Sequence, residues 1–429
     1  MIENNLSDTA PSQLYRIMAQ GAFGGILAIF FGITLSRSMV MESYGEFSAA
    51  AGMLFILGVV TPLGLGSVAV DVIRQAIKDN HYALLRGFEK GAPIVLIVAS
   101  FVALTIALGL HSIVHEKTAI SLVNFAAILI VLPLNTLIKL FKSILTGYGY
   151  AHLAGPMVGW IWTSVQLLFL GIAVFFFGDG IGVIEISIVM ASSSVVILAI
   201  MYYLTLSKRP KAANSSSKSY DMYNWLKSGM SFILIPFGMI LISHGAFFVL
   251  GWVHADAEAI ARFSATIQLA SPVIVIGIAA SALFTVPLVD AIKASDPTKI
   301  NKILHQWYKS MVPIVMGVLI ILIIFGDSLL GLYGSEFSHA HWATIFVAVS
   351  NGIFILGYLL QSRILKYSGH TQTSVKISTF WGLTGIALMY GLGDLWGEAG
   401  VVMGFIAAQI GGAVTSSIKT RQLIMSESA

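Results

Sequence analysis

The stretch from Ala92 to Leu110 reads APIVLIVASFVALTIALGL and contains no charged side chain. A helix needs about 20 mainly apolar residues to cross the hydrocarbon core of a bilayer, and this stretch has nearly that length. Backbone polar groups in lipid must be satisfied inside their own segment, so the expected structure is a helix. The stretch therefore predicts a membrane-spanning helix.

Runs of the same kind follow one another along the whole chain. Charged residues make up only 10% of the 429 residues and the mean hydropathy is +0.88, whereas soluble domains carry about a quarter charged residues. The predicted fold class is therefore an all-α polytopic membrane protein. About twelve spans are expected, at roughly 15–36, 45–70, 91–112, 118–140, 154–177, 181–205, 228–252, 258–289, 310–333, 340–362, 376–393 and 398–418.

The basic residues separate the loops into two classes. If the amino terminus is cytoplasmic, only Arg37, Lys117 and Arg262 of the 24 Lys and Arg residues fall on the outer side. Short cytoplasmic loops carry such a positive excess. We therefore expect both termini to be cytoplasmic.

The most polar internal segment is Lys208–Ser219, which reads KRPKAANSSSKS. Its serine-rich composition predicts a flexible linker between the sixth and seventh spans. The predicted organisation is an N-terminal six-helix bundle at 1–207, a cytoplasmic linker at 208–227 and a C-terminal six-helix bundle at 228–429.

Four short matches connect the two halves at a nearly constant separation of about 220 residues, which indicates an internal repeat. The matches join Glu42–Ala49 to Glu258–Ala265, Val70–Arg74 to Val289–Lys293, Pro93–Val95 to Pro313–Val315, and Ile144, Leu145 and Gly149 to Ile364, Leu365 and Gly369. An even number of spans in each copy makes the copies parallel. Two parallel six-helix bundles around a central cavity are typical of a transporter.

Several loop motifs then carry a family resemblance. They are ESYGEF at Glu42–Phe47 after Arg37, LTGYG at Leu145–Gly149, LYGSEF at Leu332–Phe337 and ILKYSG at Ile364–Gly369. With these motifs the chain resembles the O-antigen type oligosaccharide flippases of the multidrug/oligosaccharidyl-lipid/polysaccharide exporter superfamily. It departs from that pattern in the seventh span, where many relatives carry an acidic or basic residue and this chain has Ser243 and His244.

The resemblance implies a flippase in the bacterial inner membrane. Its substrate would be an undecaprenyl-pyrophosphate-linked oligosaccharide, turned from the cytoplasmic to the periplasmic leaflet by alternating access. Its implied partners are membrane lipid, a polysaccharide polymerase and chain-length proteins. We expect no cofactor, metal or nucleic acid, because the chain has no cysteine, no nucleotide-binding fingerprint and no basic run interleaved with aromatics.

A pyrophosphate inside the membrane requires cations in a water-filled cavity. The predicted substrate-binding residues are Arg37, Lys139, Lys142 and Arg363. A competing explanation is that the last three only set the topology and that Arg37 snorkels to the interface. His244 lies within a predicted span, and a histidine that titrates near neutral pH suits proton coupling. The alternative is a neutral His244 hydrogen-bonded to a neighbouring helix.

Charged residues at the ends of spans are candidates for gates. Asp71 and Arg74 recur as Asp290 and Lys293, spaced either for ion pairs within one helix or for pairs across the two bundles. On the outer side, Glu46 and Arg262 occupy matching positions with opposite charge. We expect these six residues to take part in gating, although exposed ion pairs contribute only about 0–1 kcal/mol.

Two other functions compete with lipid flipping. A gradient-coupled drug or small-molecule antiporter of the same superfamily would share the bundles, but cationic-drug exporters are expected to use buried carboxylates, and the acidic residues here lie at span ends. A membrane enzyme acting on lipid-linked sugars would need a long outer loop with catalytic residues. The outer loops predicted here are short, and the chain contains no catalytic constellation, so we expect no enzyme activity.

Overall fold

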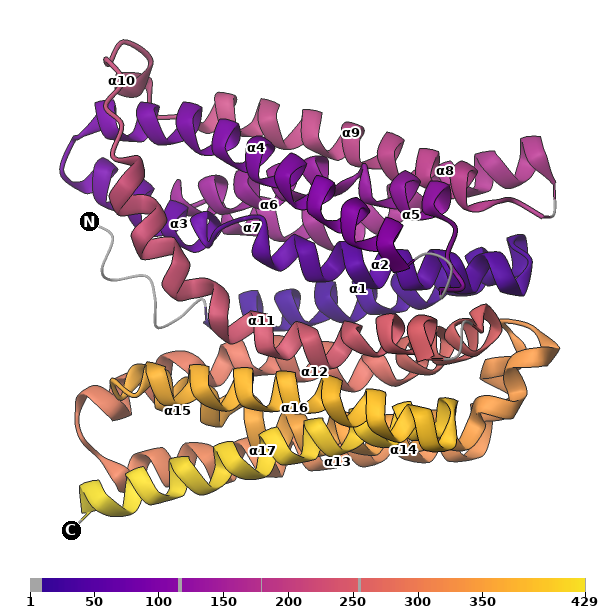
Figure 1. Cartoon of the computed structure of the whole chain (residues 1–429). Coiled ribbons are helices and arrows are strands. Elements are labelled where there is room, and N and C mark those ends of the chain that lie inside the picture. Colours follow the sequence, from indigo (N-terminus) through magenta and orange to yellow (C-terminus); the bar gives the residue numbers. More distant parts are fainter. Residues whose placement is uncertain (1–9, 115–117, 179, 254–255, 429) are drawn as a thin grey trace. The chain divides into compact units, whose positions relative to one another are not determined.

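The computed structural model describes residues 10–114, 118–178, 180–253 and 256–428 (Figure 1). Lys117 falls outside these residues. The described chain is helical nearly throughout and has no β-strand, which confirms the all-α prediction. The helices are α1 (Ala10–Ser38), α2 (Met41–Val60), α3 (Leu65–Lys78), α4 (Tyr82–Val114), α5 (Leu122–Leu129), α6 (Leu132–Gly147), α7 (Ala151–Pro156), α8 (Trp162–Phe177), α9 (Val183–Lys208), α10 (Lys211–Asn214), α11 (Met222–Val253), α12 (Ala257–Lys293), α13 (Pro297–Gly331), α14 (His341–Phe354), α15 (Leu360–Tyr367), α16 (Thr371–Trp396) and α17 (Glu398–Ser428).

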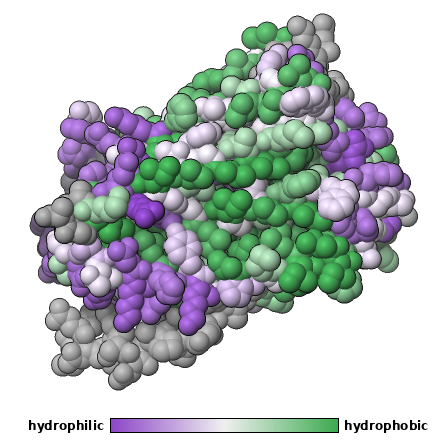
Figure 2. Space-filling view, turned by 90° about the horizontal axis from the view of Figure 1, so that it is seen from below, coloured by the Kyte–Doolittle hydropathy of each residue, from purple (hydrophilic) through white to green (hydrophobic). Residues whose placement is uncertain are grey.

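Most of these helices are long and apolar enough to cross a membrane. Ten pass that test among the described residues, or eleven if the bent pair within α11 counts as one span. The apolar part of α1, Phe23–Ser38, is shorter than the others. Large apolar side chains such as Phe175, which is 83% exposed, cover the outside. Figure 2 shows one face on which hydrophobic residues form a band between hydrophilic zones, as a lipid-facing surface requires.

Proline and glycine interrupt the second span, which runs from Met41 to Lys78. Helix α2 ends at Val60 and α3 begins at Leu65, and between them Leu63 and Gly64 have positive φ angles of 50° and 67°. Pro62 lacks the backbone N–H that would continue α2, and a glycine tolerates positive φ without a steric cost. The span therefore contains a fixed bend and not a continuous helix.

The helices pack into two compact units. The N-terminal unit comprises Leu35–Ala261, and the C-terminal unit comprises the residues up to Thr34 together with those from Arg262 onward. Most of α1, from the first predicted half, thus packs with the second half, and all described residues of α11 pack with the first. The predicted division at 208–227 describes the repeat in the sequence, whereas these units describe packing.

Small residues explain why α1 and α11 pack where they do. In the C-terminal unit, Gly21 and Gly25 of α1 face Ala279 and Val275 of α12, so that a side chain added at either glycine would contact that partner. In the N-terminal unit, Gly52 of α2 is so close to α11 that an added Cβ would lie 3.0 Å from the Cβ of Phe247. Helices in lipid associate through such close backbone approach, because lipid supplies no hydrophobic drive between them.

Helix boundaries repeat at the separation found in the sequence. Gly149 and Gly369 both follow a helix end and both have positive φ, 90° and 82°. Helix α7 starts at Ala151 and α16 starts at Thr371. Helices α9 and α17 end at Lys208 and Ser428, again at the same separation. These matches are consistent with two copies of one six-span unit.

The segment after α9, which the sequence predicts to be flexible, is attached to the N-terminal unit. Ala213 in the short helix α10 is fully buried. The Ser219 amide donates to the Ala83 carbonyl over 2.9 Å, and a side chain at Gly87 would overlap the Ser219 backbone. The serine-rich composition does not predict this attachment, because the contacts are made by backbone groups, which any residue supplies.

Candidate functional site

Lys139 lies half-buried on α6, inside the N-terminal unit. Its Nζ donates a hydrogen bond to the carbonyl oxygen of Gly58 on α2 over 2.9 Å. In an unbroken helix that carbonyl would accept from the amide of residue 62, but Pro62 has none. The bend in the second span therefore creates the acceptor that Lys139 fills. One of the three donors of the ammonium is used in this bond.

His244 on α11 belongs to the same region. Its ring stacks on Phe55 of α2, with ring centroids 4.6 Å apart, and on Phe247, 6.0 Å apart. Its Nδ1 is buried and has no hydrogen-bond partner among the described residues. The Lys139 ammonium is close enough to interact electrostatically with this ring. The structure thus brings together two residues that the sequence predicts for separate roles, substrate binding and coupling.

Lys142 lies one turn beyond Lys139 on α6 and is exposed. Neither lysine forms an ion pair with an acidic side chain within the described ranges. Two neighbouring ammonium groups without a counter-ion repel each other, so an anion that binds between them gains from both charges. This pair, together with His244 and the freed Gly58 carbonyl, is the candidate site.

The other two predicted substrate-binding residues are Arg363 and Arg37. Arg363 on α15, in the C-terminal unit, donates to the Ser281 carbonyl over 3.0 Å, to the Ser281 hydroxyl over 2.8 Å and to the Thr285 hydroxyl of α12. Arg37 is exposed in the last turn of α1. The role of these two arginines in binding substrate stays a prediction.

The predicted gate residues have local partners or none. Arg262 donates to Glu398 through Nε and Nη2 over 3.1 and 3.0 Å, within the C-terminal unit. Glu46 accepts from the Asn124 amide in the N-terminal unit.

The four remaining gate residues are exposed and form no ion pair in the described part of the chain, so the helical spacing of each pair does not produce a bond: Asp71, Arg74, Asp290 and Lys293. The gates across the bundles stay predictions.

The sequence did not predict a buried ion pair near the N-terminal end of α4. Glu89, 7% exposed, pairs with Arg209 over 2.8 Å and accepts a hydrogen bond from the Tyr148 hydroxyl. Burial and the Glu89 carboxylate raise the pKa of the Tyr148 phenol. Burial opposes the charge of Arg209, but the hydrogen bond and charge of Glu89 raise its pKa overall. No local spacing connects these three residues, so sequence patterns carry no signal for the cluster.

A buried amide network was visible in the sequence only as isolated polar residues. In the C-terminal unit, Asn351 donates to the Ala270 carbonyl over 3.1 Å, and Gln409 donates to Asn351 Oδ1 over 3.1 Å. The Ser350 hydroxyl donates to Gln409 Oε1 over 2.8 Å. The sequence places Asn351 in mid-span, but its partners come from two other helices, α12 and α17, that only the fold brings together.

Comparison with known proteins addresses the fold. No family model and no curated protein matches the sequence. A solved structure described as the inward-facing conformation of a multidrug resistance MATE family transporter of the MOP superfamily matches with a TM-score of 0.77 and 17% identity, covering 95% of each chain. The chain has the MATE transporter fold.

Two further solved structures agree with that assignment. An outward-facing conformation of a multidrug resistance MATE family transporter gives a TM-score of 0.65 at 16% identity, covering 97% of this chain and 96% of the other. A MATE in the bent conformation gives 0.65 at 18% identity, covering 97% and 95%. The predicted all-α fold with about twelve spans agrees with this architecture.

Proposed function

We propose that this protein is a secondary transporter that moves an amphipathic anion across the membrane by alternating access. The observation that carries the proposal is the Lys139–Lys142 pair on α6, two cations without an acidic partner in the described chain. Ionisable groups in membrane segments are costly and mark substrate or ion pathways. Lys139 is also held at a fixed bend, so its ammonium is positioned before any ligand arrives.

The first form of this proposal is a gradient-coupled antiporter of small amphipathic molecules. Its support is the similarity in fold to a multidrug resistance transporter, and to structures described as inward-facing and outward-facing. His244 would provide the coupling. In an antiporter the cargo and the proton occupy the site in turn, so His244 would bind the proton at Nδ1, which has no hydrogen-bond partner among the described residues, after the cargo has left.

The second form is the flipping of a lipid-linked oligosaccharide. The same lysine pair favours it, because a diphosphate accepts several charge-assisted hydrogen bonds. The polysaccharide polymerase and chain-length proteins would be partners only in this case. Both forms include cytoplasmic termini, which the distribution of basic residues favours, and an inner-membrane location, which the family resemblance implies.

The test compares cargo of opposite charge in vesicles that contain the purified protein. An anionic fluorescent amphiphile should be transported faster than its cationic analogue. The Lys139→Gln variant should lower anion transport about tenfold, the value of one charge-assisted hydrogen bond. Lys218→Gln, which removes an exposed lysine between α10 and α11, is the matched control and should transport normally.

The two forms separate in cells. If the cargo is lipid-linked oligosaccharide, deletion of the gene should cause that lipid to accumulate on the cytoplasmic leaflet, with unchanged sensitivity to amphipathic drugs. If the protein is an antiporter, drug sensitivity should change and lipid-linked sugars should not. Faster transport of the cationic probe, unaffected by Lys139→Gln, would refute both forms.

A further inference from the structure

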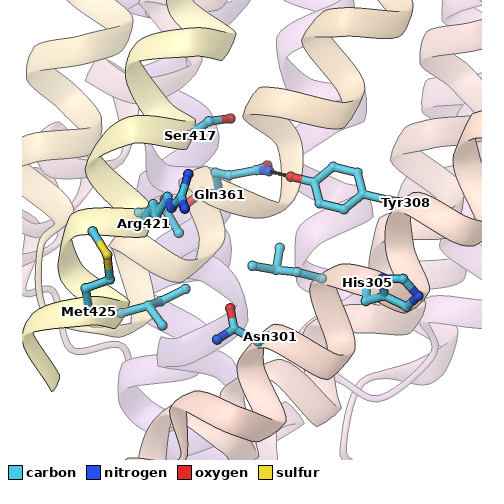
Figure 3. Close-up of a pocket in the computed structure, with 10 residues that line it drawn as sticks. Asn301, His305, Tyr308, Gln361, Ser417, Arg421 and Met425 are labelled. Carbon is cyan, nitrogen blue, oxygen red and sulfur yellow. Dashed lines mark hydrogen bonds between the residues drawn. The ribbon is translucent and has the colours of Figure 1, made fainter. Parts of the chain in front are cut away.

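The C-terminal unit contains a polar cavity of about 540 Å³ that none of the predicted roles explains. It lies where α13 begins and α17 ends, and its volume is within the roughly 300–1,000 Å³ range of small-molecule sites. Figure 3 shows polar side chains from three helices around it, with Tyr308 and Gln361 pointing toward each other and the His305 ring at the edge opposite Arg421. They are Asn301, His305 and Tyr308 of α13, Gln361 of α15, and Ser417, Thr420 and Arg421 of α17.

The donors around the cavity are not used within the protein. In the described residues, Arg421, His305 and Asn301 take part in no hydrogen bond or ion pair. Gln361, only 2% exposed, donates through Nε2 to the Tyr308 hydroxyl and to the Leu356 carbonyl, each over 2.8 Å. Its buried Oε1 has no partner among the same residues. A buried acceptor left without a donor costs about 1–3 kcal/mol, so the contacts within the protein do not account for the amide of Gln361 at this place.

The other copy of the repeat shows that the fold does not require this polarity. At the separation that joins Ile144 to Ile364, five of the seven polar residues of the cavity have an apolar counterpart in the N-terminal unit, whereas Asn301 matches His81 and Thr420 matches the half-buried Ile200. The five apolar counterparts are at most 7% exposed and form part of its core. The pairs are Leu85 with His305, Phe88 with Tyr308, Phe141 with Gln361, Ile197 with Ser417, and Met201 with Arg421.

This internal comparison separates two explanations of the cavity. If the polar residues served only to pack three helices, apolar side chains would do so at lower cost, as they do around Met201. The C-terminal unit instead combines an empty volume, a guanidinium and an orphaned amide oxygen at the same place. That combination is what a binding site requires and what a packed core avoids.

The lining defines the ligand. Arg421 and His305 supply a guanidinium and an imidazole, which suit phosphate oxygens, and no acidic residue lines the cavity. Leu304, Ile424 and Met425 form an apolar wall beside them. The helix ends around the cavity also carry exposed lysines, as expected for a membrane face that meets anionic lipid: Lys299, Lys302, Lys309 and Lys419.

We propose that this cavity binds the headgroup of an anionic glycerophospholipid. Arg421 contacts the phosphate, His305 contacts a second headgroup oxygen from the other edge of the cavity, and the glycerol backbone lies against Leu304 and Ile424. The site joins α13, α15 and α17 within one unit and shares no residue with the Lys139 site. Its existence does not depend on the cargo of the transporter.

The test measures lipid binding to the detergent-purified full-length protein by native mass spectrometry. Phosphatidylglycerol should bind more tightly than phosphatidylcholine. Arg421→Met, which introduces the side chain found at the matching position of the N-terminal unit, should weaken phosphatidylglycerol binding about tenfold or more. Lys419→Gln removes an equal charge two residues away on α17, outside the cavity, and should bind as the unchanged protein does.

A second variant keeps the proposal open to refutation if Arg421→Met folds poorly. Arg421→Lys retains the charge but loses the planar fork, so it should bind with intermediate affinity. Equal loss of binding in Arg421→Met and Lys419→Gln would overturn the proposal, because it would indicate a nonspecific charge effect. Glycerol phosphate that competes as strongly as the intact lipid would also overturn it, because the site would then recognise a soluble phosphate ester.

Discussion

Both units use a cation on the fourth span of a repeat to reach the backbone of the second span, but they use it differently. In the N-terminal unit, Lys139 donates to the Gly58 carbonyl, which the bend at Pro62 leaves without an amide partner. In the C-terminal unit, Arg363 donates to the Ser281 carbonyl and to two hydroxyls on the continuous helix α12.

The difference separates a structural cation from one available for function. Arg363 has three hydrogen bonds in place, and an anion would have to compete with them. Lys139 uses one donor and faces Lys142 and His244, so it can gain a ligand without losing a helix contact. The comparison indicates that a duplicated fold can use its cation to hold two helices together in one copy, as Arg363 does, and to bind a ligand in the other, as Lys139 does.

The largest expected effect is on stability, from the buried Glu89–Arg209 ion pair of the N-terminal unit. Arg209→Met should lower the free energy of unfolding by about 3 kcal/mol, because Glu89 would remain buried without a counter-ion. The matching position of Glu89 in the C-terminal unit holds Lys309, which is exposed and has no such partner. Thermal unfolding in detergent should show little change for Lys309→Met, and equal losses would contradict the difference between the units.

The next prediction tests whether Arg363 serves to hold α15 against α12. Arg363→Met should cost about 2 kcal/mol of stability, since its charge-assisted bonds to α12 are lost. Transport per folded molecule should stay close to normal. The measurement pairs an unfolding curve with a vesicle assay normalised to folded protein. A stable variant with lost transport would make Arg363 a binding residue, as the sequence predicted.

Lys142 should show the reverse pattern. Lys142→Gln should leave the unfolding midpoint nearly unchanged, because the side chain is exposed and unpaired, yet it should slow anion transport several-fold, by about 1 kcal/mol. Lys302→Gln, an exposed lysine on α13, serves as the control. Unimpaired anion transport in Lys142→Gln would remove it from the site.

The smallest expected effect tests why Lys139 can bond to the Gly58 carbonyl. Pro62→Ala restores an amide at residue 62, which can donate to Gly58 if α2 continues through the bend. The cost of Lys139→Met should then be about 1 kcal/mol smaller in the Pro62→Ala background than in the unchanged protein. A double-mutant cycle on unfolding measures this coupling. Additive effects would mean that the proline does not create the acceptor.

Sequence reasoning predicted what depends on local pattern. The apolar runs predicted the helices, and the repeated motifs gave the separation at which Gly149 and Gly369 both adopt positive φ. Contacts between helices could not be predicted from the sequence, because nothing near Lys139 in the chain identifies Gly58 as its partner. The packing of α1 and α11 was also missed, since it depends on glycine contacts between residues far apart in the chain.

That packing sets the order in which the protein can be built. Most of α1 leaves the ribosome well before α12, yet it packs against α12, whose residues in the same unit begin at Arg262. At roughly 5–20 residues per second, α1 waits on the order of ten seconds or more for that partner. Its glycine-lined face is exposed to lipid for this interval, so the biogenesis of this chain requires a first helix that stays inserted, unassembled and unaggregated until the last half is made.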